Sequence, residues 1–192
     1  MKKIILASKS PRRIEMLSKY FKDIKVYSSE VQEIVNPNDK PQTTVMKIAF
    51  EKASAGLKLC DEHGIIIAAD TIVYMDEVMG KPNNIEEGFQ MLKDLSGKKH
   101  SVFTGICIID TISNKKVVDF EKTEVVFNEL SDNEILKYLD LGEYIDKAGS
   151  YGIQGYGELL VKKIDGCYNN VKGLPLSKLN YLLKKHFSLE LL

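Results

Sequence analysis

Apolar residues along the chain fall into two kinds of segment: short continuous runs, and longer stretches in which they recur every three or four positions. The first pattern predicts strands, with the continuous run 65–69 typical of a strand buried on both faces, and the second predicts amphipathic helices. The expected strands are 3–7, 25–28, 65–69 (with 72–74 continuing in extended form), 101–111, 116–128 and 159–164. The expected helices are 11–20, 43–62, 85–95, 131–141 and a terminal helix opened by Pro175. Helices interleaved with strands, plus a hairpin at 113–115, predict an α/β fold with a mixed sheet.

Length and composition restrict the class of protein. A chain of 192 residues suits a single domain, 1–192, or two lobes around a cleft. Lys+Arg and Asp+Glu are both 27, so no overall basic field favours nucleic-acid binding. The first apolar run is too short for a signal peptide or a membrane span, and the three cysteines form no CxxC pair. We therefore expect a cytoplasmic protein with reduced thiols, no membrane association and three structural or surface histidines.

The segment Ser8–Arg13 follows the first expected strand. Ser10 and Pro11 are typical of the N-cap and first position of a helix. Arg12 and Arg13 then lie in the first turn, where positive charge opposes the helix dipole. An anion at this N-terminus would explain the pattern, because backbone N–H groups, the hydroxyls of Ser8 and Ser10, and two guanidinium groups all bind phosphate. The alternative is a solvated basic helix start.

Two charged residues lie on otherwise apolar elements. Lys52 is in the middle of the apolar face of helix 43–62, where it is desolvated or reaches toward an anion; alternatively its stem snorkels to solvent. Asp70 ends the most apolar strand, and ligands collect at the carboxyl ends of strands. Its carboxylate can hold a hard cation, act as a general base, or cap a turn. Thr71 adds a hydroxyl, and Lys81, in a loop, is a phosphate contact or a solvated lysine.

Further candidates flank these residues. Glu30 and Glu33 supply metal-binding oxygen or are surface charges, and the pattern leaves both possibilities open. The segment 146–155 has three glycines at three-residue spacing, which allow close backbone approach to a ligand. Within it, the Gln154 amide can pair with a base edge because it both donates and accepts. Tyr151 stacks on a ring or fills the core.

Together these segments resemble the Maf family, the septum-formation-inhibitor-like nucleoside triphosphate pyrophosphatases. The matching segments run in family order over nearly the whole chain: 6–13, 52–53, 69–73, 80–82, 104–105, 146–155 and 171–175. The late segment Asp146–Gly155 resembles the dTTP/UTP branch rather than the 7-methyl-GTP branch. Ser150 and the pair Tyr144-Ile145 depart from that branch's usual alanine and proline-aliphatic pair, which removes no functional group.

The resemblance implies a fold, a reaction and a cofactor. The fold is an elongated α/β structure with a bent mixed sheet, flanking helices and a central cleft, similar to inosine triphosphatases and often dimeric, so a homodimer is expected. The reaction is cleavage of dTTP and UTP between the α- and β-phosphates, which gives a monophosphate and pyrophosphate in a nucleotide house-cleaning role. Asp70 matches the proton acceptor, and Arg12, Thr71 and Gln154 match positions linked to substrate choice. The implied cofactor is a divalent cation, Mg²⁺ or Mn²⁺.

The residues and the resemblance agree on a site. We predict catalytic roles for Asp70, Lys52 and Lys81, substrate binding by Ser8, Arg12, Arg13, Thr71 and Gln154, and metal binding by Asp70 and Glu33. Four cationic side chains are enough to hold a triphosphate without a globally basic protein. Two other hypotheses remain: a nucleotide-binding regulator of septum formation with little catalysis, and a pyrophosphatase for 7-methyl-GTP or non-canonical purine nucleotides.

Overall fold

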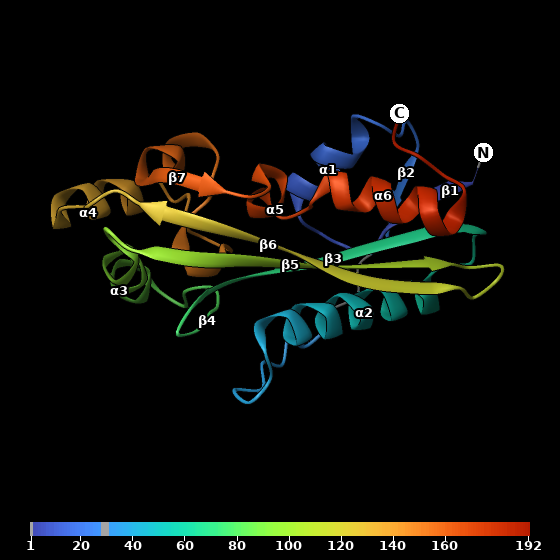
Figure 1. The fold of residues 1–192 in the computed structure, drawn as a ribbon, viewed down its shortest axis with the longest axis horizontal. Helices are drawn as coiled ribbons and strands as arrows, with labels where there is room; N and C mark the ends of the chain where they lie inside the picture. The colour runs from blue at the N-terminus through green and yellow to red at the C-terminus, as the bar shows by residue number, and fades with distance from the viewer. Residues whose placement is uncertain (1, 28–30) are drawn as a thin grey trace.

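The computed structural model describes residues 2–27 and 31–192, and shows an elongated α/β molecule (Figure 1). The strands are β1 (Lys3–Leu6), β2 (Ile24–Val26), β3 (Gly64–Met75), β4 (Glu77–Met79), β5 (Lys99–Asp110), β6 (Lys116–Phe127) and β7 (Val161–Asp165). The helices are α1 (Pro11–Ser18), α2 (Pro41–Leu59), α3 (Ile85–Leu95), α4 (Asp132–Asp140), α5 (Tyr168–Lys172) and α6 (Leu176–Phe187), with 3₁₀ turns η1 (Ala148–Ser150) and η2 (Gly155–Leu160).

One mixed sheet joins the seven strands of the described residues in the order β2-β1-β3-β5-β6-β7, with β4 paired to β3 outside this path. The strands β2, β1 and β3 are parallel, whereas β3, β5, β6 and β7 pair antiparallel. The expected mixed α/β class and the hairpin between β5 and β6 are therefore confirmed. The sequence did not predict β4 or α5, because β4 has three residues and α5 has five, which is too few to show a repeating pattern of apolar positions.

Helices cover both faces of the sheet. In Figure 1, α2 lies along one face, and α1, α5 and α6 lie along the other. Alternate residues of β3 accordingly enter different clusters: Ile66 packs with Ala53 of α2, and Ile67 packs with Leu183 of α6. Beyond the middle of β3, Val73 belongs to a further cluster that includes residues of α3 and α4. Asp70 lies between these apolar regions.

Asp70 is inside β3, which corrects the expectation that it ends its strand. β3 continues to Met75 because β5 pairs with it from Ile65 to Tyr74. The opening has a different origin: on the edge away from β5, β1 ends opposite Ile67, and β4, which runs antiparallel, ends opposite Val73. Between those points, no strand of the described residues pairs with this edge of β3. Asp70 and Thr71 lie in this gap and, as successive strand residues, point to opposite faces of the sheet.

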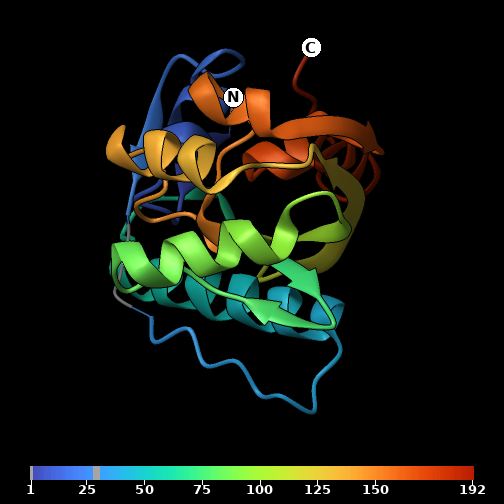
Figure 2. The same cartoon turned by 90° about the vertical axis from the view of Figure 1, so that its left-hand side faces the viewer.

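A close approach fixes α2 over this part of the sheet. Gly105 of β5 pairs with Asp70, and a Cβ at Gly105 would lie 2.2 Å from the carbonyl oxygen of Val45 in α2. Two turns further along the helix, Lys52 lies above Asp70. The segment that leads into α2, residues 31–40, runs without regular structure below that helix in Figure 2. This segment carries Glu33, whereas Glu30 lies outside the described residues.

Within residues 2–27 and 31–192, no helix combines the length and hydrophobicity needed to cross a membrane.

We predict that Gly105→Ala lowers the free energy of unfolding by about 1–3 kcal/mol or more, because the added methyl overlaps backbone that cannot rotate away. Urea unfolding measures the change. Gly80→Ala is the matched control, because a Cβ there meets nothing within 4 Å. Equal stabilities for the two variants would contradict this account of how α2 is placed.

Candidate active site

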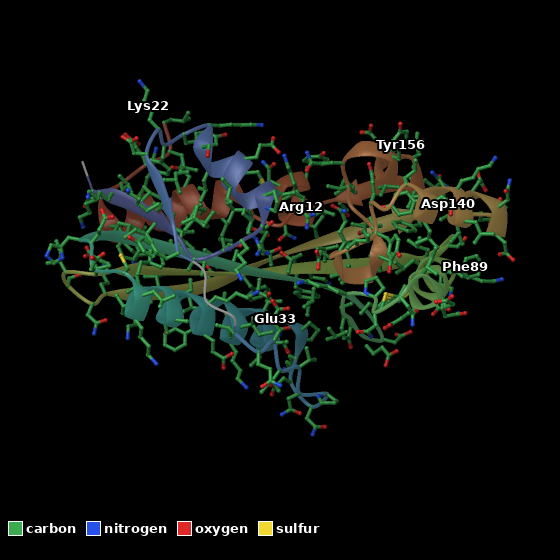
Figure 3. The ribbon with its side chains drawn as sticks, turned by 180° about the vertical axis from the view of Figure 1, so that it is seen from behind. Arg12, Lys22, Glu33, Phe89, Asp140 and Tyr156 are labelled. Atoms are coloured by element: carbon green, nitrogen blue, oxygen red, sulfur yellow. The ribbon has the colours of Figure 1, made fainter. Side chains whose placement is uncertain are left out.

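A cleft of about 720 Å³ opens at the middle of the molecule, around the uncovered edge of β3. Its walls come from the turn between β1 and α1, from Val31 and Glu33, from the loop after β4, from residues of the segment 143–155 and from the end of α5. In Figure 3, Arg12 and Glu33 lie near the middle of the long axis on opposite sides of the sheet, while Lys22 and Asp140 lie toward the ends. The cleft therefore reaches both faces of the sheet at one edge.

Lys52 joins two carboxylates on the α2 face. Its Nζ lies 2.6 Å from Asp70 Oδ1 and 2.6 Å from Glu33 Oε1, and its side chain is only 16% exposed. The prediction that Lys52 reaches an anion is confirmed, and the snorkelling alternative is wrong. Burial raises the pKa of Asp70 above its usual value, although Lys52 and Arg13 oppose that effect. Burial also acts to raise the pKa of Glu33, but the hydrogen bond from Lys52 and nearby cations outweigh it, so that pKa is lowered.

Arg13 is a buried cation on the opposite face. Its Nε donates to the Gly173 carbonyl at 2.8 Å, and its Nη2 donates to Thr71 Oγ1 at 2.9 Å. Its Nη1 donates to Ser8 Oγ at 3.4 Å. All three acceptors are neutral, and in the described part of the chain no carboxylate forms an ion pair with Arg13. A buried guanidinium whose direct partners are all neutral is costly, and Asp70 acts on it only through space, so this end of the cleft suits an anion.

The start of α1 has the expected position but not the expected cap. Ser10 is the N-cap residue, yet its hydroxyl makes no capping bond; instead Ser8 Oγ accepts the Ser10 N–H at 3.2 Å. The half-buried Arg12 lines the cleft, where burial lowers its pKa against the opposing effect of Asp146. Lys81 is exposed at the rim. The structure thus brings the expected phosphate-binding residues to one cleft, while their roles stay predictions.

The glycine-rich segment closes the other side of the cleft. Gly149 does not serve ligand approach as expected, because the space beside it is filled by Val73, and its N–H donates to the Gly80 carbonyl at 3.0 Å. Gly149 also has φ +65°, which favours glycine. Gln154 lines the cleft, and its side-chain amide has no hydrogen-bond partner among the described residues. It is available to a ligand.

Tyr151 belongs to the core, which decides between its two expected roles. Its hydroxyl lies 2.7 Å from Nε2 of His100, and its ring packs edge-on against Phe127. Burial lowers the pKa of His100 to about 4, so the imidazole is neutral near pH 7. This placement confirms the structural role expected for His100.

Three cleft residues were missed by the sequence analysis: Glu143, Lys147 and Lys172. The Glu143 carboxylate packs on Gly155 and accepts the Tyr156 N–H at 3.4 Å, and Lys147 Nζ donates to the Glu143 carbonyl. Glu143 lies just before the glycine-rich segment and Lys147 lies within it, and that proximity was the available signal. Lys172 lies in the matching segment 171–175, but nothing local assigned it to the cleft, because its position depends on the short helix α5.

A metal site is the least complete part of the arrangement. No cluster of three or more His, Cys, Asp or Glu side chains occurs in residues 2–27 and 31–192. Glu33 and Asp70 nevertheless direct one oxygen each at the same ammonium group, so two carboxylates converge on one cationic centre. Lys52 Nζ itself fills that centre, so a hard cation would use the remaining lone pairs of the two carboxylates together with water and substrate oxygens.

Comparison with known proteins gives consistent matches. A family model described as Maf-like protein matches residues 3–186. A relative from Thermoanaerobacter sp. (strain X514), named dTTP/UTP pyrophosphatase, is 50% identical over 99% of this chain and 100% of its own. A protein of the same name from Caldicellulosiruptor saccharolyticus is 48% identical over 96% of this chain and 95% of its own. Among solved structures, a HAM1 protein from Coxiella burnetii is similar with a TM-score of 0.52 and 15% identity, covering 82% of this chain and 79% of that one, which shows the fold alone.

We predict that Asp70→Asn is at least as stable as the parent protein near neutral pH. Because the pKa of Asp70 is raised on folding, the folded protein binds this proton more tightly than the unfolded chain. Ionisation of Asp70 therefore costs stability as the pH rises from about 4, the usual carboxyl value, through the higher folded value. Urea unfolding from pH 4 to 8 should show the advantage of the variant growing over that window.

Asp110→Asn is the control of opposite sign. The hydrogen bond from Lys2 lowers the pKa of Asp110, so this ionised carboxylate stabilises the fold. The variant should lose stability relative to the parent as the pH rises. The same sign of pH dependence in both variants would refute the electrostatic account.

Proposed function

The chain belongs to the Maf-like protein family, and on that premise we propose that it is a nucleoside triphosphate pyrophosphatase that hydrolyses dTTP and UTP to the monophosphate and pyrophosphate. The observation that carries the proposal is one cleft that holds a buried carboxylate, Asp70, between a cationic end and an open amide, Gln154. The named relatives support the choice of bases, and the geometry supports the chemistry.

The cationic end suits a triphosphate. Arg13 offers guanidinium hydrogens not used by its three neutral acceptors, and Arg12 and Lys81 line the same cleft. These charges offset the negative charge that collects on the leaving pyrophosphate, which is the main contribution a protein makes to phosphoryl transfer. Ser8 holds the turn from which both arginines extend.

Asp70 is suited to accept a proton from water. Lys52 occupies its Oδ1, and Oδ2 has no hydrogen-bond partner in the described residues. In the proposed step, the water oxygen bonds to a phosphorus of the α–β anhydride, Oδ2 takes the proton, and the P–O bond to the bridging oxygen breaks. A raised pKa moves this carboxylate toward the range in which general bases are most effective.

In this proposal the nucleobase of the substrate binds at the Gln154 end of the cleft. The amide donates one hydrogen bond and accepts another, which matches the carbonyl and N–H edge of uracil and thymine. Gln154 belongs to the glycine-rich segment, which packs on β3 and is hydrogen-bonded to the loop after β4. The sheet therefore supports the end of the cleft that would bind the nucleobase.

We also propose a divalent cation, Mg²⁺ or Mn²⁺, held by Glu33 and Asp70. When bound with substrate, such an ion neutralises phosphate charge and lowers the pKa of water. Lys52 would then orient both carboxylates through one oxygen each, which leaves Asp70 Oδ2 free for the proton of the attacking water.

We predict that the purified protein releases pyrophosphate and monophosphate from dTTP and UTP, and much less from CTP, ITP or 7-methyl-GTP. Asp70→Asn should lower kcat by about 10²–10⁴-fold, the usual contribution of a general base. Quantitative anion-exchange chromatography of the products measures both.

Asp140→Asn is the matched control, because this exposed carboxylate lies far from Arg12 in Figure 3. It should retain full turnover.

Turnover of ITP or 7-methyl-GTP by the parent protein, in place of dTTP and UTP, would overturn the nucleobase assignment. Tight binding of dTTP without turnover would favour the regulator hypothesis.

We predict that activity requires the added cation and that Glu33→Gln raises the Mn²⁺ concentration for half-maximal activity by about tenfold, the usual order of effect for loss of one metal-binding contact. Titration of activity with Mn²⁺ measures the shift. The exposed neighbour Gln32 provides the control Gln32→Ala, which should leave the titration unchanged. Full activity in the presence of excess chelator would exclude the proposed metal.

A further inference from the structure

A chain of hydroxyl groups runs from Arg13 into the interior of the sheet. Thr71 Oγ1 accepts from Arg13 Nη2 at 2.9 Å and lies 2.9 Å from Thr104 Oγ1. Thr104 Oγ1 donates in turn to the main-chain carbonyl of Asn170 at 3.0 Å. Thr104 is on β5, is fully buried and does not line the cleft.

The direction of every bond in this chain is fixed by its two ends. The Asn170 carbonyl can only accept, so Thr104 donates its single hydroxyl hydrogen to that oxygen. Thr104 must then accept a hydrogen bond from Thr71, which donates its own hydroxyl hydrogen to Thr104. At the other end, the guanidinium can only donate, so Thr71 accepts from Arg13. The three contacts therefore form one consistent directional series.

This series leaves Thr71 no hydrogen to give to a ligand. The Thr71 hydroxyl is held with a lone pair toward the guanidinium of Arg13 and its hydrogen toward β5. Its effect on a phosphate is then exerted through Arg13, whose other contacts are the Gly173 carbonyl and Ser8. All of these acceptors are neutral, so the direction of the guanidinium depends on the three hydrogen bonds and not on a direct ion pair within the described residues.

We propose that Thr104 is a positioning residue that sets Arg13 through Thr71, and that Thr71 serves the substrate as an acceptor for Arg13 and not as a donor to phosphate. This inference rests on the proposed function only for its kinetic readout. Thr104 and Thr71 are opposite each other in the β3–β5 register, so the pair is built into the sheet. The sheet thereby orients a side chain of α1.

The test is Thr104→Val, which keeps the shape of the side chain and removes the hydroxyl. We expect the KM for dTTP to rise about tenfold, the loss expected when a misaligned Arg13 gives up one hydrogen bond to the charged phosphate, and kcat to change less than about twofold. Thr104→Ser, which retains the hydroxyl, should restore the parent KM. An unchanged KM in Thr104→Val would overturn the proposal.

The control is Thr123→Val. Thr123 is also buried, and its hydroxyl contacts the side-chain amide of Asn170 and the backbone of Cys167, so it anchors α5 without joining the series to Arg13. This variant should keep the parent KM even if it loses thermal stability. A rise in KM equal to that of Thr104→Val would assign the effect to α5 packing and refute the relay.

A double-mutant cycle with Arg13→Lys tests whether Thr104 acts through Arg13. In the Arg13→Lys background, Thr104→Val should raise KM by less than about twofold, because residues in one network are not additive. Additive effects would overturn the proposal. If Thr104→Val fails to fold, Thr71→Val takes its place in the same cycle with the same expectation.

Binding of inorganic tripolyphosphate, measured by calorimetry, separates this inference from the proposed function. The dissociation constant should rise about tenfold in Thr104→Val and stay unchanged in Thr123→Val, whether or not the protein hydrolyses dTTP. Absence of turnover with this pattern would remove the proposed function and leave the relay. Turnover of dTTP with equal tripolyphosphate affinities in all variants would do the reverse.

Discussion

The contact between Lys52 and Asp70 is the interaction on which the site depends. A carboxylate as buried as Asp70 is costly to ionise, and the cost is partly offset here by an ammonium group at 2.6 Å that also holds Glu33. Lys52 can reach that position only because α2 packs against β5 without an intervening side chain at Gly105. The packing of α2 on β5 and the ionisation of Asp70 are therefore linked, because the same helix carries Lys52.

The second constraint is the short stretch of β3 that no neighbouring strand covers. Because β1 ends opposite Ile67 and the pairing with β4 covers only Val73 to Met75, both faces of the sheet are accessible at Asp70 and Thr71. One residue meets Lys52 on the α2 face and the next meets Arg13 on the α1 face. A ligand lying across this edge contacts the charged groups of both faces at once, and a single strand holds the two sets in register.

Much of this arrangement was predictable from local patterns. The period of apolar residues located β3, β5, β6 and the long helices, and a lysine on an apolar helix face correctly indicated a buried anion partner. Other features were not predictable, because they depend on contacts between distant segments. The place where β1 stops relative to β3 is a matter of register, the hydroxyl of the N-cap residue Ser10 makes no capping bond, and Lys172 enters the cleft through a five-residue helix.

The continuity of β3 through the cleft has a mechanical consequence. The turn between β1 and α1 and the glycine-rich segment are attached toward opposite halves of β3, so bending of the long strands between those halves would widen the cleft. Asp70 lies between those two halves, where bending of the strand displaces atoms least. The Asp70 carboxylate and Lys52 would therefore keep their positions while the segments that contact the two ends of a ligand move apart.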